Sequence, residues 1–217
     1  MAISSYCERL DLAFWAEPLN AVTNAAFLLA GLAALRLIRR DRPADRALLG
    51  LSALVMLIGV GSFLFHTVPA RWSLLADVVP IQLFAVCYVG LALRRMLGLS
   101  PRAALAGSVL FLAACLGLAA VLAPVLPPPI RGAAGYAGFL AGLFGMALAV
   151  SLRGVRVTAR HLALCGAVFM LSLGFRSLDG ALCAQWPAGL HWAWHLLNGL
   201  VLYLLLRTAA LHARSAA

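Results

Sequence analysis

Near the C-terminus the chain reads Gly189-Leu190-His191-Trp192-Ala193-Trp194-His195-Leu196-Leu197-Asn198-Gly199, and this apolar run continues to Leu206. As a helix, the run places His191 and His195 about one turn apart on one face, as two metal ligands on one helix must be. A polar side chain inside a membrane-spanning segment is costly, and it marks a functional site that needs partners from other segments. The fold must therefore bring further polar groups to this face.

The composition is that of an integral membrane protein. Hydrophobic residues make up 64% and charged residues 11% of the 217 residues, which is too apolar for a water-soluble fold of this size. Since a membrane-spanning helix needs roughly 20 residues, the apolar runs predict an all-α bundle of seven transmembrane helices, at about 18–38, 47–66, 73–93, 103–123, 132–152, 161–178 and 190–206. Residues 1–17 then form an outer N-terminal segment, and residues 207–217 form a cytoplasmic tail.

The arginines indicate the orientation of the bundle. Most of them follow the first, third, fifth and seventh predicted helices, on one side of the membrane, and only Arg9, Arg71, Arg131 and Arg176 lie on the other. Because short cytoplasmic loops hold the positive charge, we expect the N-terminus outside and the C-terminus in the cytoplasm. An arginine-only, alanine-rich chain with short loops further predicts a bacterial inner-membrane protein whose site faces the periplasm.

Two classes of protein are excluded by the basic residues. The net charge of +10 is explained by this topology, so we expect no nucleic-acid partner. A retinal Schiff base requires a lysine, and the sequence contains none. The chain is therefore not a seven-helix retinal pigment.

The partners of the two histidines lie around the short connector between the second and third runs. Ser62 and His66 share one face at the end of the second run, and Asp77 comes about one turn into the third. Three neutral histidines leave the fourth position of a tetrahedral zinc ion open to water, whereas a structural zinc site is closed. The sequence therefore predicts zinc on His66, His191 and His195, with Asp77 as general base and Ser62 as hydrogen-bond donor to an oxyanion.

The histidines could also have roles without zinc. Each one could form a hydrogen bond with a neighbouring helix. A b-type haem would use two histidines as axial ligands, and it would leave the third histidine and Asp77 without a role. We expect Trp192 and Trp194 to be anchors at the membrane interface.

The N-terminal segment carries the carboxylates of Glu8, Asp11 and Glu17. Oxygen ligands of this kind suit Ca²⁺, and the alternative is a solvated acidic segment that caps the first helix. Cys7 and Cys183 are the two cysteines predicted outside the helices and outside the cytoplasm, where thiols oxidise. We therefore expect a disulfide between them, which would tie the segment to the loop before the last helix.

The motifs Tyr6-Cys7-Glu8, Ala16-Glu17-Pro18-Leu19-Asn20, Gly59-Val60-Gly61-Ser62-Phe63-Leu64-Phe65-His66, Leu75-Ala76-Asp77-Val78-Val79-Pro80-Ile81 and His191-Trp192-Ala193-Trp194-His195 together resemble the alkaline ceramidase family of seven-helix membrane amidases. The resemblance implies zinc-dependent hydrolysis of the amide of ceramide or a related long-chain lipid amide, with the zinc and catalytic residues named above. It also implies a calcium site with Glu8 and Glu17 as ligands and Tyr6 through its carbonyl. Ser5 and Leu10 replace two of the family's ligands, so Asp11 or backbone oxygens would have to substitute.

Related seven-helix proteins with the same zinc pattern include hormone-receptor-like members. The alternative function is therefore a lipid-sensing receptor or scaffold with a structural zinc. A hydrolase needs Asp77 and Ser62 beside an open zinc position, and a structural site does not.

Overall fold

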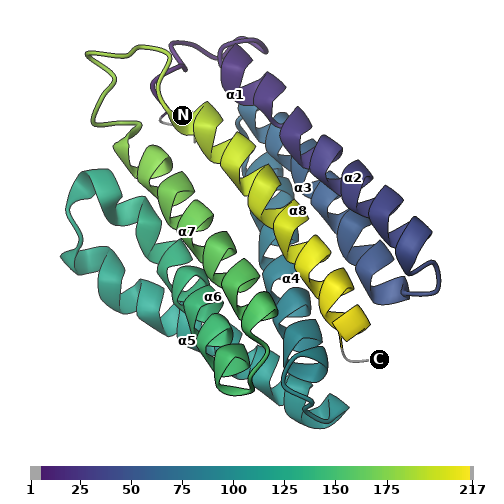
Figure 1. The fold of residues 1–217 in the computed structure, drawn as a ribbon. Helices are drawn as coiled ribbons and strands as arrows, with labels where there is room; N and C mark the ends of the chain where they lie inside the picture. The colour runs from purple at the N-terminus through teal and green to yellow at the C-terminus, as the bar shows by residue number, and fades with distance from the viewer. Residues whose placement is uncertain (1–5, 216–217) are drawn as a thin grey trace.

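The computed structural model describes residues 6–215, so Ser5 lies outside the described part of the chain. Helices make up its architecture (Figure 1). They are α1 (Pro18–Thr23), α2 (Ala25–Asp41), α3 (Arg46–Thr67), α4 (Arg71–Arg95), α5 (Pro101–Val125), the 3-10 helix η1 (Pro128–Ala133), α6 (Ala134–Leu152), α7 (Arg156–Leu178) and α8 (His191–Ser215).

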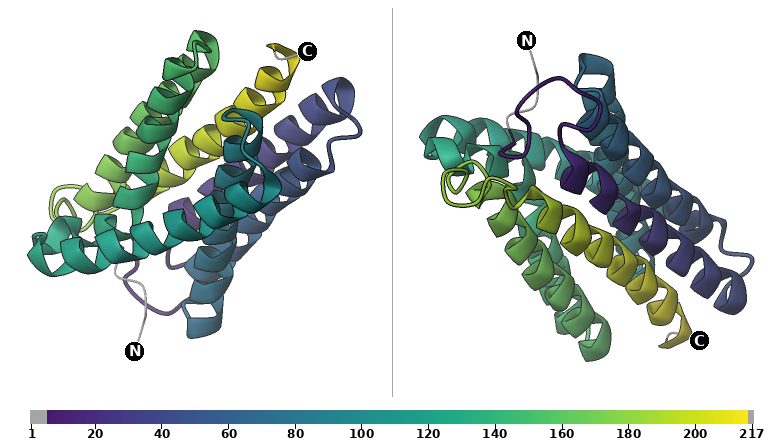
Figure 2. Two further views of the ribbon diagram at one scale, coloured as in Figure 1. Left: turned by 90° about the horizontal axis from the view of Figure 1, so that it is seen from below. Right: turned by 90° about the horizontal axis from the view of Figure 1, so that it is seen from above.

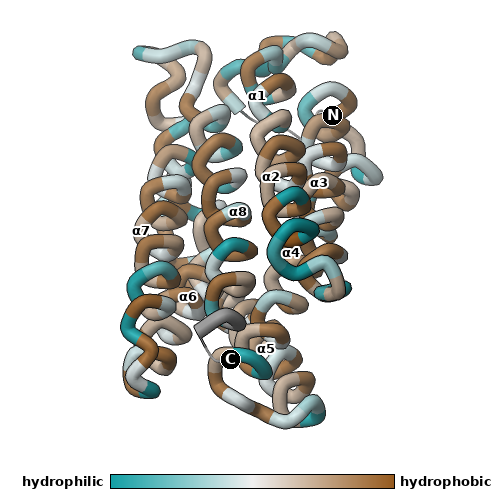
Figure 3. Tube along the Cα trace, turned by 45° about the vertical axis from the view of Figure 1, so that its right-hand side comes forward, coloured by the Kyte–Doolittle hydropathy of each residue, from teal (hydrophilic) through white to brown (hydrophobic). Residues whose placement is uncertain are grey.

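Seven helical spans of the described chain are long and apolar enough to cross a membrane, counting Pro18–Asp41 as one. The predicted all-α, seven-span fold is thereby confirmed. Figure 3 shows the reason: apolar residues follow the shafts of the helices, and polar residues gather at their ends. Large apolar side chains such as Leu29, Leu105 and Leu148 point outward from the bundle, as they would toward lipid.

The spans form a closed ring. Each one packs against its neighbours along the chain, and α8 closes the ring by packing against α2 as well as α7 (Figure 1). Residues 6–17 and the α7–α8 connection lie together at one end of the bundle, which we term the lid end; Figure 2 shows the N-terminal segment crossing it. The first and last helices therefore meet where the predicted site residues lie.

Several helices are longer than the predicted runs. Helix α8 continues to Ser215, so residues 207–215 extend the last helix as an unbroken part of it. Pro124, which follows the predicted fourth span at 103–123, lies in the last turn of α5. At the N-terminus of α3, the Asp45 carboxylate caps the helix by accepting a hydrogen bond from the Leu48 amide.

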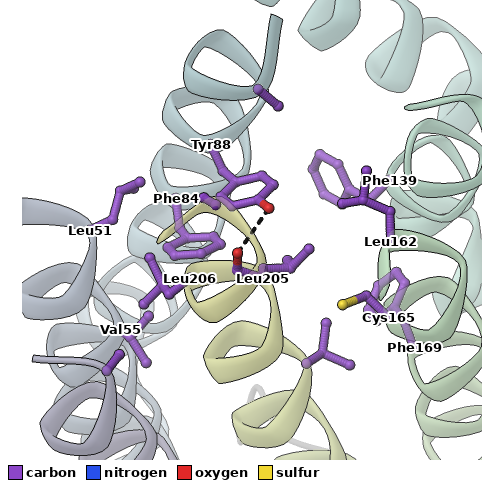
Figure 4. Packing of buried hydrophobic residues seen from close by; sticks show 14 of the residues in the cluster. Leu51, Val55, Phe84, Tyr88, Phe139, Leu162, Cys165, Phe169, Leu205 and Leu206 are labelled. Carbon is purple, nitrogen blue, oxygen red and sulfur yellow. Dashed lines mark hydrogen bonds between the residues drawn. The ribbon is translucent and has the colours of Figure 1, made fainter. Parts of the chain in front are cut away.

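The core lies where α8 meets the other helices (Figure 4). Leu206 of α8 is fully buried, and Val55 of α3 and Leu162 of α7 are buried in the same cluster. The Tyr88 hydroxyl donates a hydrogen bond of 2.9 Å to the Leu205 carbonyl, which joins α4 to α8. Since a buried hydroxyl without a partner is costly, this bond fixes α4 across the ring.

One close approach positions the site. A Cβ atom added at Gly61 would overlap the carbonyl oxygen of Ala76. Only glycine lets the backbones of α3 and α4 come this close. The approach brings the turn of α3 that carries Ser62 next to the turn of α4 that carries Asp77.

Candidate metal centre and cavity

Three histidines converge just below the lid end. His66 lies in the last turn of α3, and His191 and His195 lie in the first turns of α8. All three are buried, with exposed fractions of 1–2%, and one ring nitrogen of each lies within 4.8 Å of the others. The Nε2 atoms of His66 and His195 and the Nδ1 atom of His191 have no hydrogen-bond partner among residues 6–215.

This donor set fits a zinc ion. Buried polar atoms are costly when unpaired, and each of the three rings has one such nitrogen. Three converging imidazoles have the composition of a catalytic zinc site. Hydrogen bonding of each histidine to a neighbouring helix would leave these three atoms unaccounted for. The sequence also predicted the carboxylate of Asp77 and the hydroxyl of Ser62 beside the three histidines.

The other ring nitrogens of two histidines are held by the N-terminal part of the chain. The Nδ1 atom of His66 lies 2.5 Å from the Oε2 atom of Glu17, and the Nδ1 atom of His195 lies 3.0 Å from the Thr23 hydroxyl. Such partners set the tautomer and orientation of a metal-binding imidazole. The aromatic ring of Tyr6 stacks on His191 with centroids 3.8 Å apart.

Asp77 and Ser62 lie together, as expected. Ser62 is buried on α3 and Asp77 is half-buried on α4, and the Asp77 carboxylate interacts with the Ser62 hydroxyl and, at longer range, with His66 and Arg176. Both residues line a cavity of about 530 Å³ that also reaches His191 and His195.

The cavity extends from the histidines toward the end of the bundle opposite the lid end. Apart from the polar groups near the histidines, its walls are largely apolar, and Phe111, Phe139 and Met146 of α5 and α6 form part of one wall. Asp77 and Leu93 both line it, and at 1.5 Å per residue they lie roughly 24 Å apart along α4. The cavity therefore has the shape and polarity to hold a long aliphatic chain.

Trp194 does not have the predicted role of an interface anchor. It is only 4% exposed, and it lines the cavity, where it packs against Phe169 and Tyr136. The expectation was wrong because Trp194 lies on the face of α8 that points into the ring, so its indole faces the cavity. Trp192 is partly exposed, and its indole N–H donates to the Gly189 carbonyl.

Asp179 holds the parts of the lid end together. Its carboxylate accepts hydrogen bonds from the backbone N–H groups of Cys7, Leu190 and His191, at 3.2, 2.6 and 3.0 Å. A carboxylate at the N-terminus of α8 also suits the helix dipole. Cys183 forms a disulfide with Cys7, the pair expected from the sequence. These contacts hold the neighbouring Tyr6 over the histidines.

The residues expected to bind calcium are engaged in other ways. The guanidinium of Arg9 pairs with the Glu17 carboxylate and donates to the carbonyls of His66 and Asp11, at 2.6 and 3.2 Å. The Glu8 carboxylate accepts from the amides of Leu19 and Asn20, at 2.6 and 2.9 Å, and so caps α1. A cationic side chain thus already occupies the cluster of oxygen atoms, which does not fit a Ca²⁺ site.

The ionisation of the lid residues agrees with these contacts. Burial by itself raises the pKa of Glu17, but its interactions with His66, Asn20 and Arg9 outweigh burial and lower the pKa to about 2. Burial raises the pKa of the Tyr6 hydroxyl to about 12, against the opposing charge of Arg176. Glu17 is therefore an anion and Tyr6 a neutral phenol at neutral pH.

Arg9, Thr23 and Arg176 were not singled out as site residues from the sequence. Arg176 could have been noticed, because it is an arginine at a helix end on the side of the membrane where basic residues are rare. Arg176 and Asp179 lie three residues apart, but they form no ion pair in the described chain.

Comparison with known proteins identifies a family. Residues 4–215 match the model of a family described as Ceramidase, which covers nearly the whole chain. No curated protein matches the chain.

Proposed function

The chain belongs to the ceramidase family, and from this premise we propose that it is a zinc-dependent amidase of the membrane. It hydrolyses the amide of ceramide or a related long-chain lipid amide to a fatty acid and a long-chain amine. His66, His191 and His195 hold the zinc ion. The observation that carries this proposal is that one ring nitrogen of each histidine lies within 4.8 Å of the others, beside an apolar cavity that also contains a carboxylate and a hydroxyl.

The side chains have separate tasks in this reaction. A zinc ion held there would lower the pKa of a bound water to about 7, which makes a nucleophile available at neutral pH. Asp77 accepts the proton of the attacking water and returns it to the leaving nitrogen as the carbon–nitrogen bond breaks. Ser62 donates a hydrogen bond to the carbonyl oxygen while negative charge develops on it.

Groups outside the reaction centre support these tasks. Glu17 and Thr23 orient His66 and His195. The apolar cavity walls bind the acyl chain and exclude water, which strengthens the electrostatic interactions inside. The lid end of the bundle lies on the outside of a bacterial inner membrane in this proposal, so the reaction takes place on the periplasmic side.

The test combines metal analysis with turnover. Protein purified in detergent should contain about one zinc per chain and release fatty acid from a short-chain ceramide. His195→Ala should lose both zinc and activity. Asp77→Asn should keep the zinc and lose activity by roughly 10²- to 10⁴-fold. His161→Ala is the matched control. It replaces a histidine near the start of α7 that belongs to none of the motifs, and it should keep both zinc and activity.

Two further outcomes select the alternatives. Zinc without turnover of ceramides or simple lipid amides would favour a lipid-sensing receptor or scaffold with a structural zinc. Iron with a haem spectrum would contradict both functions.

A further inference from the structure

Arg176 is a charged residue in the cavity that the proposed reaction does not use. It lies two residues before Leu178, the last residue of α7, and its side chain lines the cavity. One of its nitrogens donates a hydrogen bond of 3.1 Å to the Tyr6 hydroxyl. The guanidinium carbon lies 5.2 Å from the ring centres of both Tyr136 and Trp194.

No carboxylate of the described chain forms an ion pair with Arg176; the ion pairs found there involve Arg9, Arg40, Arg95 and His66. Asp179 is nearby in sequence, but its oxygens accept the three backbone N–H groups of the lid end. Asp77 acts on Arg176 only at longer range. Arg176 is therefore a cation held in an apolar cavity by a phenol and two aromatic faces.

Such an arrangement is costly unless a ligand completes it. Arg176 is half-buried. A charge withdrawn from water is costly unless it is paired, and cation–π contacts replace only part of its hydration. A guanidinium offers five donors in a planar fork that matches a carboxylate, and within residues 6–215 only the bond to Tyr6 uses one of them. The rings of Tyr136 and Trp194 fix the plane of the guanidinium group, but they do not neutralise its charge.

The position of Arg176 relative to the histidines decides which part of a ligand it meets. Tyr6 contacts both Arg176 and the histidines. Its hydroxyl accepts a hydrogen bond from Arg176, and its ring stacks on His191. Trp194 likewise packs against Arg176 and His191. Arg176 thus lies at the histidine end of the cavity, where the amide would lie, and away from the apolar end that suits the chain.

We propose that Arg176 binds the carboxylate of a long-chain ligand at the reaction centre. This assignment rests on the proposed amidase function, which places the amide of the ligand beside the histidines. The carboxylate can come from two sources. It is either on the amine part of the substrate, as in an N-acyl amino acid, or it is the carboxylate of the fatty acid that hydrolysis releases.

The first arm of the test compares two substrates that differ only in the charged group. N-lauroylglycine and N-lauroylethanolamine have the same chain and amide, but only the first carries a carboxylate. If the substrate supplies the carboxylate, the ratio of their kcat/KM values should favour the glycine conjugate and should fall roughly 10- to 100-fold in Arg176→Gln. Arg176→Lys, which keeps the charge without the fork, should restore part of the ratio.

The second arm measures binding without turnover. Displacement of a fluorescent fatty acid by laurate and by dodecanol reports recognition of the free carboxylate. If the product supplies it, Arg176→Gln should weaken laurate roughly 10- to 100-fold relative to dodecanol and leave the substrate ratio unchanged. This arm also separates the two proposals, because selective laurate binding in a protein with no amidase activity would contradict only the function.

Matched controls exclude a structural effect. Arg131→Gln removes an exposed arginine of η1, and it should change neither ratio. Zinc content and Tm of Arg176→Gln show whether the variant is folded. An unchanged substrate ratio together with an unchanged laurate-to-dodecanol ratio in folded Arg176→Gln would overturn the assignment, and so would an equal loss for charged and uncharged ligands in both arms.

Discussion

The Nδ1 atom of His66 lies 2.5 Å from the Oε2 atom of Glu17, so a residue that precedes the first span orients a ligand of the candidate metal centre on the second. The same carboxylate pairs with Arg9. The N-terminal segment is therefore a part of the centre, although it contributes none of the three converging nitrogens.

Glu17→Gln should lower the affinity for zinc by roughly 10- to 100-fold, because the partner that fixes the imidazole of His66 is weakened. Competition with a chromophoric chelator measures this affinity. Glu8→Gln is the matched control, since the Glu8 carboxylate bonds the amides of Leu19 and Asn20 and not a metal-centre histidine in the described chain. Equal zinc affinity in Glu17→Gln and the wild type would contradict the orienting role.

Calcium should not stabilise the protein. Arg9 already supplies the positive charge among Glu17 and the carbonyls of His66 and Asp11, so Tm should be the same with millimolar Ca²⁺ and with EGTA. Arg9→Met should lower Tm, since it removes a charge partner from a buried carboxylate. A rise of several degrees in the wild type on adding Ca²⁺, reversed by EGTA, would show that the metal displaces the arginine.

Gly61→Ala should abolish activity while zinc stays bound. The new methyl group would overlap the Ala76 carbonyl, and relief of the overlap moves α4 and Asp77 away from Ser62, at a cost of about 1–3 kcal/mol in stability. Gly117→Ala is the control, because a Cβ atom there would meet no described atom within 4 Å beyond its chain neighbours and the backbone of its own helix. Full activity in Gly61→Ala would mean that the spacing of α3 and α4 does not matter for catalysis.

Asp45 should contribute to the dependence of the protein's stability on pH. Burial raises the pKa of this carboxyl, but the hydrogen bonds from Arg95 and the Leu48 amide, with the charges of Arg95 and Arg42, outweigh burial and lower it. A lowered folded pKa contributes stability that is present above the unfolded pKa of about 3.9 and is lost as the pH falls through the folded value. Because the pair is partly solvated, the contribution is at most about 1 kcal/mol.

Thermal unfolding of Asp45→Asn and the wild type from pH 3 to pH 7 measures this contribution. The difference in Tm should be constant above about pH 5 and should shrink below about pH 4. A difference that grows toward low pH would have the wrong sign for an ion pair with Arg95.

The spans and the converging histidines could be predicted because each depends on a local pattern. Apolar length identifies a span, and His191 and His195 share a face at any helix rotation. The roles of Arg9 and Trp194 could not be predicted in this way. Arg9 lies in a segment without periodicity, so the sequence does not indicate its partners. His191 and His195 mark one inward face of α8, but the helix is apolar on its other sides, so the sequence does not indicate that Trp194 also lines the cavity. The packing of α8 between α2 and α7 decides which of its apolar side chains face the interior.

Ring closure also sets the order in which the protein can mature. His66 enters the membrane with the second span, whereas His191 and His195 arrive only with the last, and Cys183 is synthesised 176 residues after Cys7. A nascent chain that has inserted six spans has neither a complete metal centre nor this partner for its N-terminal cysteine. Completion of the candidate metal centre and oxidation of the disulfide are therefore late events, which follow the insertion of all the spans.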